Sequence, residues 1–276
     1  MSPSGAAPGT AQGPLPLPEV HRLVAPPHWR AVDLLSDLHL QEGLPATLAT
    51  FREHLLHTTA EAVLILGDLF EVWVGDDAAA DGFEHHCAEL LREASRHRWI
   101  GFMAGNRDFL VGPNFLSGAG VHALPDPTLL DFQGQRYLLT HGDLLCIDDL
   151  DYQRFRAQVR AAQWRAGFLA QPLAQRREIA AGLRRASEQR KREHGPEAYA
   201  DLDVASVERW LDDSGADVLV HGHTHRPASH PVAGGRCRHV LSDWDLDAAD
   251  PGHPRRAEVL RLSGAGVVRL DLSAPC

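Results

Sequence analysis

The chain has 276 residues, of which 44% are apolar and 23% charged, a composition typical of a folded globular protein that can bury a core without disulfide bonds. Its formal net charge of −10 argues against general nucleic-acid binding, and no apolar stretch reaches the roughly 18 residues that a transmembrane helix needs. The N-terminus has no secretion-signal pattern and the four cysteines form no Cys-x-x-Cys pair, so we expect a cytoplasmic chain without a thiolate zinc site.

The first segment, residues 1 to about 28, is rich in Pro, Gly and Ala and has no hydrophobic periodicity. This composition predicts a disordered tail. We expect the remaining residues, 29–276, to form one domain, because a chain of this length suits a single domain that carries an insertion.

Five short apolar runs follow, at 31–35, 62–66, 99–103, 137–139 and 218–220. Each run ends in Gly or polar residues, which is typical of buried strands. Amphipathic patterns over 45–59 and 83–97 predict helices between the first three runs. Alternating strands and helices indicate an α/β fold. Two further alternating segments, 257–262 and 266–272, predict a closing hairpin.

Residues 148–210 break this pattern, because they contain no strand-like run and look helical throughout. Between 152 and 195 there are 11 Arg or Lys and 3 Glu, with apolar residues such as Trp164, Phe168 and Leu169 among them. The segment can be a solvated helical face. We favour a second interpretation, a helical insertion that meets an anionic and partly apolar partner.

Potential metal ligands follow each of the five apolar runs. They are Asp37 and His39, then Asp68, then Asn106, then His141, and finally His223 and His225. A single Asp-x-His or a single buried His occurs in many proteins without a metal. Five such clusters, each at the carboxyl end of a predicted strand, are much more specific, because open α/β sheets place their sites at that edge.

The ligand types indicate the metal and the chemistry. Carboxylates, imidazoles and an amide oxygen suit manganese, iron or zinc, and the absence of thiolates disfavours a structural zinc site. Seven ligands are too many for one ion, but they suit two ions that share a carboxylate, which we expect Asp68 to supply. Sites with two metals commonly catalyse in-line displacement at phosphorus or acyl hydrolysis.

The order of these motifs resembles the calcineurin-like metallophosphoesterase superfamily. The motifs are Asp-x-His at 37–39, Gly-Asp at 67–68, Gly-Asn-x-Asp at 105–108, His-Gly-Asp at 141–143 and Gly-His-x-His at 222–225. The resemblance implies a β-sandwich flanked by helices, with a dinuclear site at the strand ends. It assigns one ion to Asp37, His39, Asp68 and His225, and the other to Asp68, Asn106, His141 and His223.

Longer stretches, among them 67–77 and 105–110, are similar to one family within this superfamily, the UDP-2,3-diacylglucosamine diphosphatases of lipid A biosynthesis. These enzymes release UMP and leave 2,3-diacylglucosamine 1-phosphate. Many members of the superfamily have His after the asparagine, whereas this chain and the diphosphatases have Arg107. The resemblance implies two divalent ions, which we expect to be Mn²⁺, and catalytic roles for Asp68, Asn106 and Arg107. A guanidinium suits a phosphate leaving group, because it stabilises charge on phosphate oxygens.

That family also has a helical lid that holds acyl chains, at the position of 148–210. The resemblance implies substrate contacts from six residues, Asn106, Arg107, Asp149, Ser187, Lys191 and His223. The chain departs from the family pattern near Lys191, where the family's usual lysine is missing. A lipid-linked UDP-sugar as substrate implies a hydrolase that lies peripherally on the cytoplasmic face of the inner membrane. We favour a monomer.

Two other functions remain open. A metallophosphoesterase that acts on a soluble phosphodiester, nucleotide or phosphoprotein would have the same metal ligands, but it has no use for a basic and apolar insertion. A catalytically silent scaffold of the same fold would have lost ligands, and this chain retains all seven.

Overall fold

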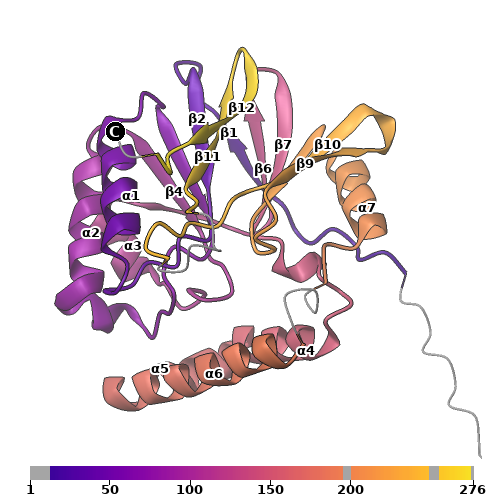
Figure 1. Cartoon of the computed structure of the whole chain (residues 1–276). Helices are drawn as coiled ribbons and strands as arrows, with labels where there is room; N and C mark the ends of the chain where they lie inside the picture. The colour runs from indigo at the N-terminus through magenta and orange to yellow at the C-terminus, as the bar shows by residue number, and fades with distance from the viewer. Residues whose placement is uncertain (1–12, 195–199, 249–254, 275–276) are drawn as a thin grey trace, which may run out of the picture.

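The computed structural model describes residues 13–194, 200–248 and 255–274. Two six-stranded sheets pack face to face, and helices cover the outer face of each sheet (Figure 1). The prediction of an α/β sandwich flanked by helices is therefore confirmed.

The early apolar runs form the centre of the first sheet. Its strand order is β12 (Gly266–Asp271), β11 (Glu258–Ser263), β2 (Ala31–Leu35), β3 (Ala62–Leu66), β4 (Trp99–Met103) and β5 (His122–Leu124). Strands β2 to β5 are parallel, and the hairpin β11–β12 adds an antiparallel edge. All five residues of β3 are buried, because the second sheet covers one face and helices cover the other.

The second sheet joins strands that lie far apart in the sequence. Its order is β1 (His21–Val24), β6 (Thr128–Phe132), β7 (Gln135–Thr140), β8 (Val218–His221), β10 (Arg236–Val240) and β9 (Ala228–Val232). The parallel pair β7–β8 carries two of the predicted ligand clusters. Leu34, Leu64, Leu139 and Val220 belong to the apolar core that the sheets share.

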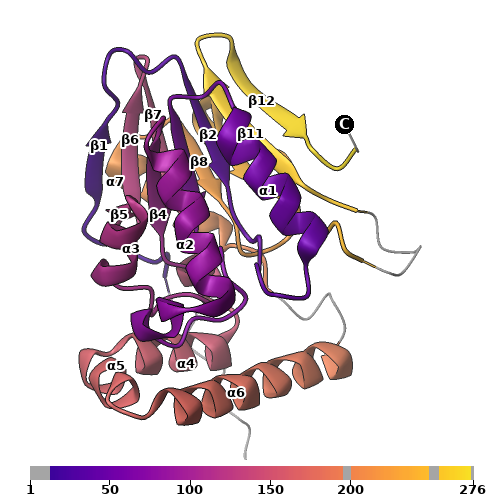
Figure 2. The ribbon, with the colours of Figure 1, turned by 90° about the vertical axis from the view of Figure 1, so that its left-hand side faces the viewer.

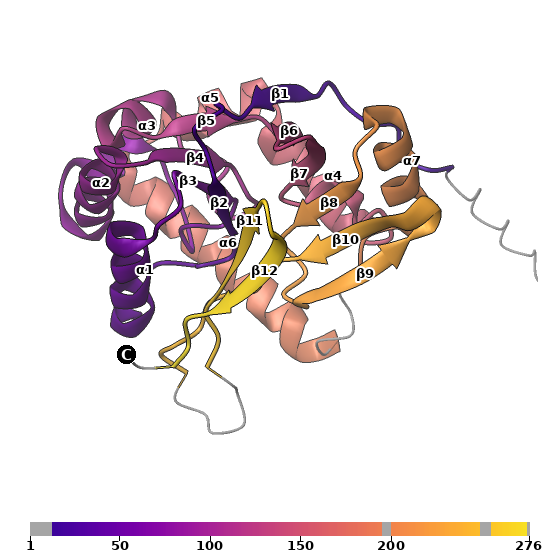
Figure 3. The same cartoon turned by 90° about the horizontal axis from the view of Figure 1, so that it is seen from above.

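Each outer face has its own helices. Helices α1 (Pro45–His57), α2 (Gly82–Ser95) and α3 (Pro113–Ala119) cover the first sheet, and α7 (Val204–Ser214) covers the second (Figures 1 and 3). Short 3₁₀ turns follow at η1 (Asp76–Ala80), η2 (Asp143–Leu145) and η4 (Ala233–Gly235). The predicted helices 45–59 and 83–97 match α1 and α2 to within two residues.

The prediction of a disordered tail over residues 1 to about 28 is wrong for residues 13–28. Strand β1 pairs with β6 in parallel register, and Leu15 and Leu17 pack against the cluster that contains Trp210. The Leu15 amide also donates to Ser206 Oγ at 2.8 Å. The high Pro content hid these contacts, because proline is compatible with an extended chain at a sheet edge. Residues 1–12 lie outside the described residues.

Three helices form a separate layer at one end of the sandwich: α4 (Leu150–Arg160), α5 (Ala162–Leu169) and α6 (Leu173–His194) (Figures 1 and 2). We call them the helical layer. The predicted insertion at about 148–210 also included α7, but this helix belongs to the sandwich, because Trp210 and Leu211 are buried against the second sheet. None of the helices in the described part of the chain is long and apolar enough to span a bilayer.

Candidate metal centre

The seven predicted ligands converge at the end of the sandwich that faces the helical layer. Asp37 and His39 follow β2, Asp68 follows β3, Asn106 follows β4, His141 follows β7, and His223 and His225 follow β8. Both sheets therefore contribute, because parallel strands bring their carboxyl ends to the same edge.

Five of these residues have left-handed backbone conformations. Positive φ angles occur at Asp37 (54°), His39 (50°), Asp68 (54°), His223 (67°) and His225 (53°). Among the described residues, Gln133 is the only other non-glycine residue with positive φ. Each such residue costs on the order of 1–3 kcal/mol, and strain of this kind concentrates at functional sites.

One group of ligand atoms comprises Asp37, His39 and His225. One potential ligand atom from each lies within 4.8 Å of the others. The Nε2 atoms of the two imidazoles are 3.2 Å apart, and His225 Nε2 is 3.3 Å from an Asp37 oxygen. Three donor atoms that converge in this way can bind one divalent ion.

A second group contains Asp37, Asp68 and His141, again within 4.8 Å. Asn106 Oδ1 lies 2.9 Å from His141 Nε2 and 2.7 Å from His223 Nδ1, which adds an amide and a further imidazole. Asp37 belongs to both groups, whereas the sequence analysis assigns the shared carboxylate to Asp68. The bridging role of Asp68 therefore stays a prediction.

Glycines allow this close packing. A Cβ at Gly105 would lie 2.1 Å from an Asp68 carboxylate oxygen, and a Cβ at Gly222 would lie 2.3 Å from an Asp37 oxygen. No real side chain tolerates such contacts, so these two motif glycines are required by the approach of the carboxylates.

The electrostatics favour a bound cation. Burial by itself lowers the pKa of His141, but neighbouring carboxylates, first that of Asp68 and then that of Asp37, outweigh burial and raise this pKa to about 9. Burial raises the pKa of Asp37, but the adjacent His225 holds this carboxyl well below its usual range. The centre is therefore strongly electronegative, which suits divalent ions.

His223 differs from its neighbour. Burial and the adjacent His141 lower the pKa of His223 to about 3, so its imidazole is neutral at pH 7, as a metal ligand must be. Buried carboxylates, imidazoles and an amide oxygen form a donor set that fits two divalent ions better than one.

Asp108, the last residue of the Gly-Asn-x-Asp motif, supports the loops that carry the ligands. It is buried and accepts hydrogen bonds from the backbone amides of Gly105 (2.8 Å) and Leu69 (2.7 Å). These bonds tie the loop after β3 to the loop after β4. No role is predicted for Asp108 from the sequence, although it belongs to the Gly-Asn-x-Asp motif.

Glu71 is a second residue that the sequence analysis missed. One carboxylate oxygen, Oε2, lies 3.0 Å from His39 Nδ1. The other oxygen, Oε1, lies 3.7 Å from Arg107 Nη1 and 3.4 Å from Arg184 Nε on α6. Glu71 thus contacts a predicted ligand, the predicted catalytic arginine and the helical layer.

Asp143, from the His-Gly-Asp motif, joins the helical layer to the centre. Its buried carboxylate accepts hydrogen bonds from Tyr152 Oη (2.6 Å), Arg156 (2.8 Å) and Arg160 (3.4 Å), all on α4. Arg160 also donates to the backbone carbonyl of Gly105 at 2.9 Å. Burial raises the pKa of Asp143, but Arg160 and Arg156 hold it far below its usual range.

The predicted substrate contacts of Asp149, Ser187 and Lys191 stay predictions. The Asp149 side chain caps the N-terminus of α4 by accepting a hydrogen bond from the Tyr152 backbone amide at 3.0 Å. Ser187 and Lys191 lie on α6, and their side chains are outside the described residues. The ring of Tyr152 lies 5.7 Å from that of His223, so α4 borders the centre directly.

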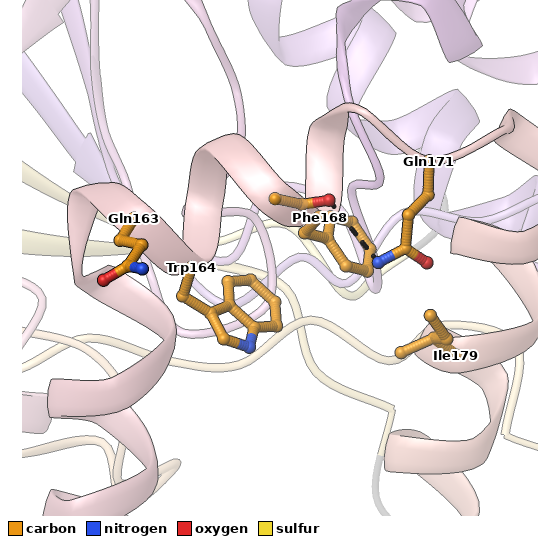
Figure 4. Close-up of a pocket in the computed structure, with 6 residues that line it drawn as sticks. Gln163, Trp164, Phe168, Gln171 and Ile179 are labelled. Carbon is orange, nitrogen blue, oxygen red and sulfur yellow. Dashed lines mark hydrogen bonds between the residues drawn. The ribbon is translucent and has the colours of Figure 1, made fainter.

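An apolar cavity of about 320 Å³ opens between α5 and α6. Its lining includes Trp164, Phe168 and Ile179, with Gln163 and Gln171 at its sides (Figure 4). The rings of Trp164 and Phe168 stack with centroids 5.0 Å apart. Both aromatic residues are among the apolar residues that interrupt the basic segment between 152 and 195.

Comparisons with known proteins show the family. The family model of the calcineurin-like phosphoesterases matches residues 31–227. The chain is 44% identical over 237 residues to a UDP-2,3-diacylglucosamine hydrolase from Aromatoleum aromaticum, which covers 84% of this chain and 93% of the relative. It is 41% identical over 251 residues to a UDP-2,3-diacylglucosamine hydrolase from Chromobacterium violaceum, which covers 88% and 99%.

Solved structures of phosphoesterases are more distant. A phosphoesterase from E. coli is 19% identical with a TM-score of 0.41, over 85% of this chain and 88% of that one. The family resemblance seen in the sequence is confirmed by the family model and the curated relatives. The chain therefore belongs to the calcineurin-like phosphoesterases and, within them, to the family of the UDP-2,3-diacylglucosamine hydrolases.

Proposed function

We propose that the protein hydrolyses the diphosphate bond of UDP-2,3-diacylglucosamine in lipid A biosynthesis. Water attacks the α-phosphorus, the bridging P–O bond breaks, and UMP and 2,3-diacylglucosamine 1-phosphate (lipid X) leave. The observation that carries this proposal is the position of the metal centre directly beneath a basic helical layer with an apolar cavity. The names of the curated relatives support the same substrate.

The residues at the centre divide the chemistry between them. Asp37, His39, Asp68 and His225 would hold one ion, and Asp68, Asn106, His141 and His223 the other. Two divalent ions, for which we propose Mn²⁺, supply Lewis-acid stabilisation of phosphate charge and lower the pKa of water. Arg107 stabilises negative charge on the diphosphate oxygens, and no proton is needed by a phosphate leaving group.

The helical layer would hold the lipid part of the substrate. We propose that Asp149, Ser187 and Lys191 contact the substrate, together with Asn106, Arg107 and His223 at the centre. The acyl chains enter the cavity between α5 and α6, where each buried methylene contributes roughly 0.8 kcal/mol. A cavity of about 320 Å³ with an apolar lining suits part of such a chain.

The outer surface of the helical layer would contact the membrane. Leu150, Phe155 and Leu183 are large apolar residues of this layer that remain exposed, 53%, 37% and 43% respectively. Arginines between them attract anionic headgroups. We propose a monomer that associates peripherally with the cytoplasmic face of the inner membrane.

The test is to incubate the purified chain with Mn²⁺ and detergent-dispersed UDP-2,3-diacylglucosamine. Release of UMP and lipid X in equal amounts, lost on chelation and restored by Mn²⁺, is the expected result. Release of UDP instead would place the attack elsewhere. Turnover of small phosphodiesters without turnover of the lipid would favour the alternative, a phosphoesterase for a soluble substrate.

A further inference from the structure

Glu71 occupies a junction between three parts of the proposed active site. Its side chain is 11% exposed, and its two oxygens have different partners. Oε2 faces His39 Nδ1 at 3.0 Å, while Oε1 faces the guanidinium groups of Arg107 and Arg184 at 3.7 and 3.4 Å.

The backbone fixes the position of Glu71. The loops after β2 and β3 run side by side, because the amides of His39 and Leu40 donate to the carbonyls of Asp68 (3.0 Å) and Leu69 (2.8 Å). The Glu71 amide then donates to the Leu40 carbonyl at 3.2 Å. These main-chain hydrogen bonds therefore place the backbone of Glu71 next to that of His39.

The contact orients the imidazole. A carboxylate at Nδ1 keeps the proton on that nitrogen and leaves the Nε2 lone pair for a metal ion. His39 Nε2 points toward His225 Nε2, 3.2 Å away, which is the position of the first ligand group. The positive φ of His39 is a strained conformation that such a contact helps to maintain.

We propose that Glu71 is a positioning residue that acts through both oxygens of its carboxylate. Oε2 orients His39 as a metal ligand. Oε1 holds Arg107 at the centre and ties α6 to it through Arg184. This inference rests on the proposed function for its metal and its substrate, but the role of Glu71 in metal binding can be measured without any substrate.

Two substitutions separate the two roles. Glu71→Ala removes both contacts. Glu71→Gln retains one oxygen that can accept a hydrogen bond from His39 Nδ1. Its NH₂ group would then face the guanidinium groups of Arg107 and Arg184, and it cannot accept hydrogen bonds from them. We therefore expect Ala to impair both metal binding and catalysis, and Gln to impair catalysis chiefly.

The first measurement is a Mn²⁺ titration followed by EPR. In Glu71→Ala we expect one of the two sites to weaken by roughly 10–100-fold, since loss of a residue that supports a ligand has effects of this size. The other site and the melting temperature of the metal-free protein should match the wild type. Glu71→Gln should remain within about threefold of the wild type at both sites.

The second measurement is kcat and KM for UMP release at saturating Mn²⁺. Glu71→Gln should lower kcat by roughly tenfold or more, because Arg107 loses its fixed position. Glu42→Ala is the matched control, because exposed Glu42 lines the same neighbouring cavity as Glu71 and contacts no predicted ligand. It should match the wild type in both measurements.

Wild-type Mn²⁺ affinity at both sites in Glu71→Ala would overturn the role of Glu71 toward His39. A wild-type kcat in Glu71→Gln would overturn its role toward Arg107. Equal weakening of both sites with a lowered melting temperature would mean that Glu71 only supports the fold, which also contradicts the proposal. Failure of the wild type to release UMP would instead contradict the proposed function. The Mn²⁺ titration would still test the role of Glu71 in metal binding.

Discussion

Asp68 belongs to the second group of ligand atoms, where its Oδ1 atom lies 3.7 Å from His141 Nε2 and accepts a hydrogen bond from the Arg107 amide at 2.8 Å. We expect Asp68→Asn to abolish turnover, because the neutral amide withdraws negative charge from both ions at once. UMP release and metal content by mass spectrometry check this result. A variant that keeps two ions and a tenth of the activity would show that another carboxylate, such as Asp37, bridges the ions.

Arg107 is the residue that departs from the superfamily pattern. We expect Arg107→His to slow UMP release by roughly 10²–10³-fold, the loss associated with one charge-assisted contact in a site shielded from water. Metal content should not change, since Arg107 contributes only a backbone amide to Asp68. An unchanged rate would mean that the side chain only packs against Glu71. Arg107→Lys keeps the positive charge but lacks the planar guanidinium group, so its rate of UMP release should lie between those of the wild type and Arg107→His.

At the scale of elements, a buried ion pair joins β2 to β11 and α1. Asp33 is fully buried on β2 and accepts hydrogen bonds from Arg261 Nε (2.7 Å) on β11 and from Thr58 Oγ1 (2.6 Å) after α1. His54 Nε2 on α1 lies 3.1 Å away. Burial raises the pKa of Asp33, but Arg261 and His54 outweigh it and hold this pKa well below the usual range.

This pair predicts an acid-sensitive contribution to stability. Because the folded-state pKa of Asp33 lies below its unfolded value of about 4, the pair stabilises the fold above that pH and is lost as pH falls further. Asp33→Asn should lower the free energy of unfolding by roughly 3 kcal/mol at pH 7. As the pH decreases below 4, the free energy of unfolding of this variant should decrease less than that of the wild type. Urea unfolding at several pH values measures both. Asp131→Asn, which breaks the more exposed pair with Arg22, should cost less than about 1 kcal/mol.

Helix α5 carries the apolar lining of the proposed acyl site. Replacement of Trp164, Phe168 and Leu169 by serine should reduce kcat/KM for the lipid substrate by at least roughly 100-fold, because burial of several methylenes is lost. A small chromogenic phosphodiester should still be cleaved at about the wild-type rate, since these residues lie outside the metal centre. Equal losses on both substrates would mean that α5 is a structural cap.

At the scale of the whole molecule, the N-terminal segment closes one edge of the sandwich. Deletion of residues 1–24 removes β1 together with the contacts of Leu15 and Leu17. We expect the free energy of unfolding to fall by at least about 2 kcal/mol relative to a chain without residues 1–12, since two partly buried leucines together contribute on this order. Thermal and urea unfolding of the two deletion variants check this. Equal stability would mean that β1 is dispensable.

Short-range patterns in the sequence were enough to predict most of the elements. The runs 31–35, 62–66 and 99–103 coincide with β2, β3 and β4, because strands buried on both faces are predominantly apolar; Asp33 is the exception, since ion pairing compensates for its burial. The polar residues that follow these runs indicated a metal site, because the carboxyl ends of parallel strands lie at the same edge of a sheet. The family resemblance then supplied the expected grouping of the ligands.

Other features depend on contacts between distant residues and were decided only by the tertiary structure. Strand β1 was missed because its partner, β6, begins about a hundred residues later and its own sequence is rich in proline nearby. Helix α7 was placed in the insertion because its amphipathic pattern does not say which surface it covers. The roles of Glu71 and Asp143 could not be predicted from the sequence, because their partners, His39 and the residues of α4, are brought to them by folding. Sequence spacing indicates only which residues are neighbours along the chain, whereas the partners of a side chain depend on three-dimensional proximity.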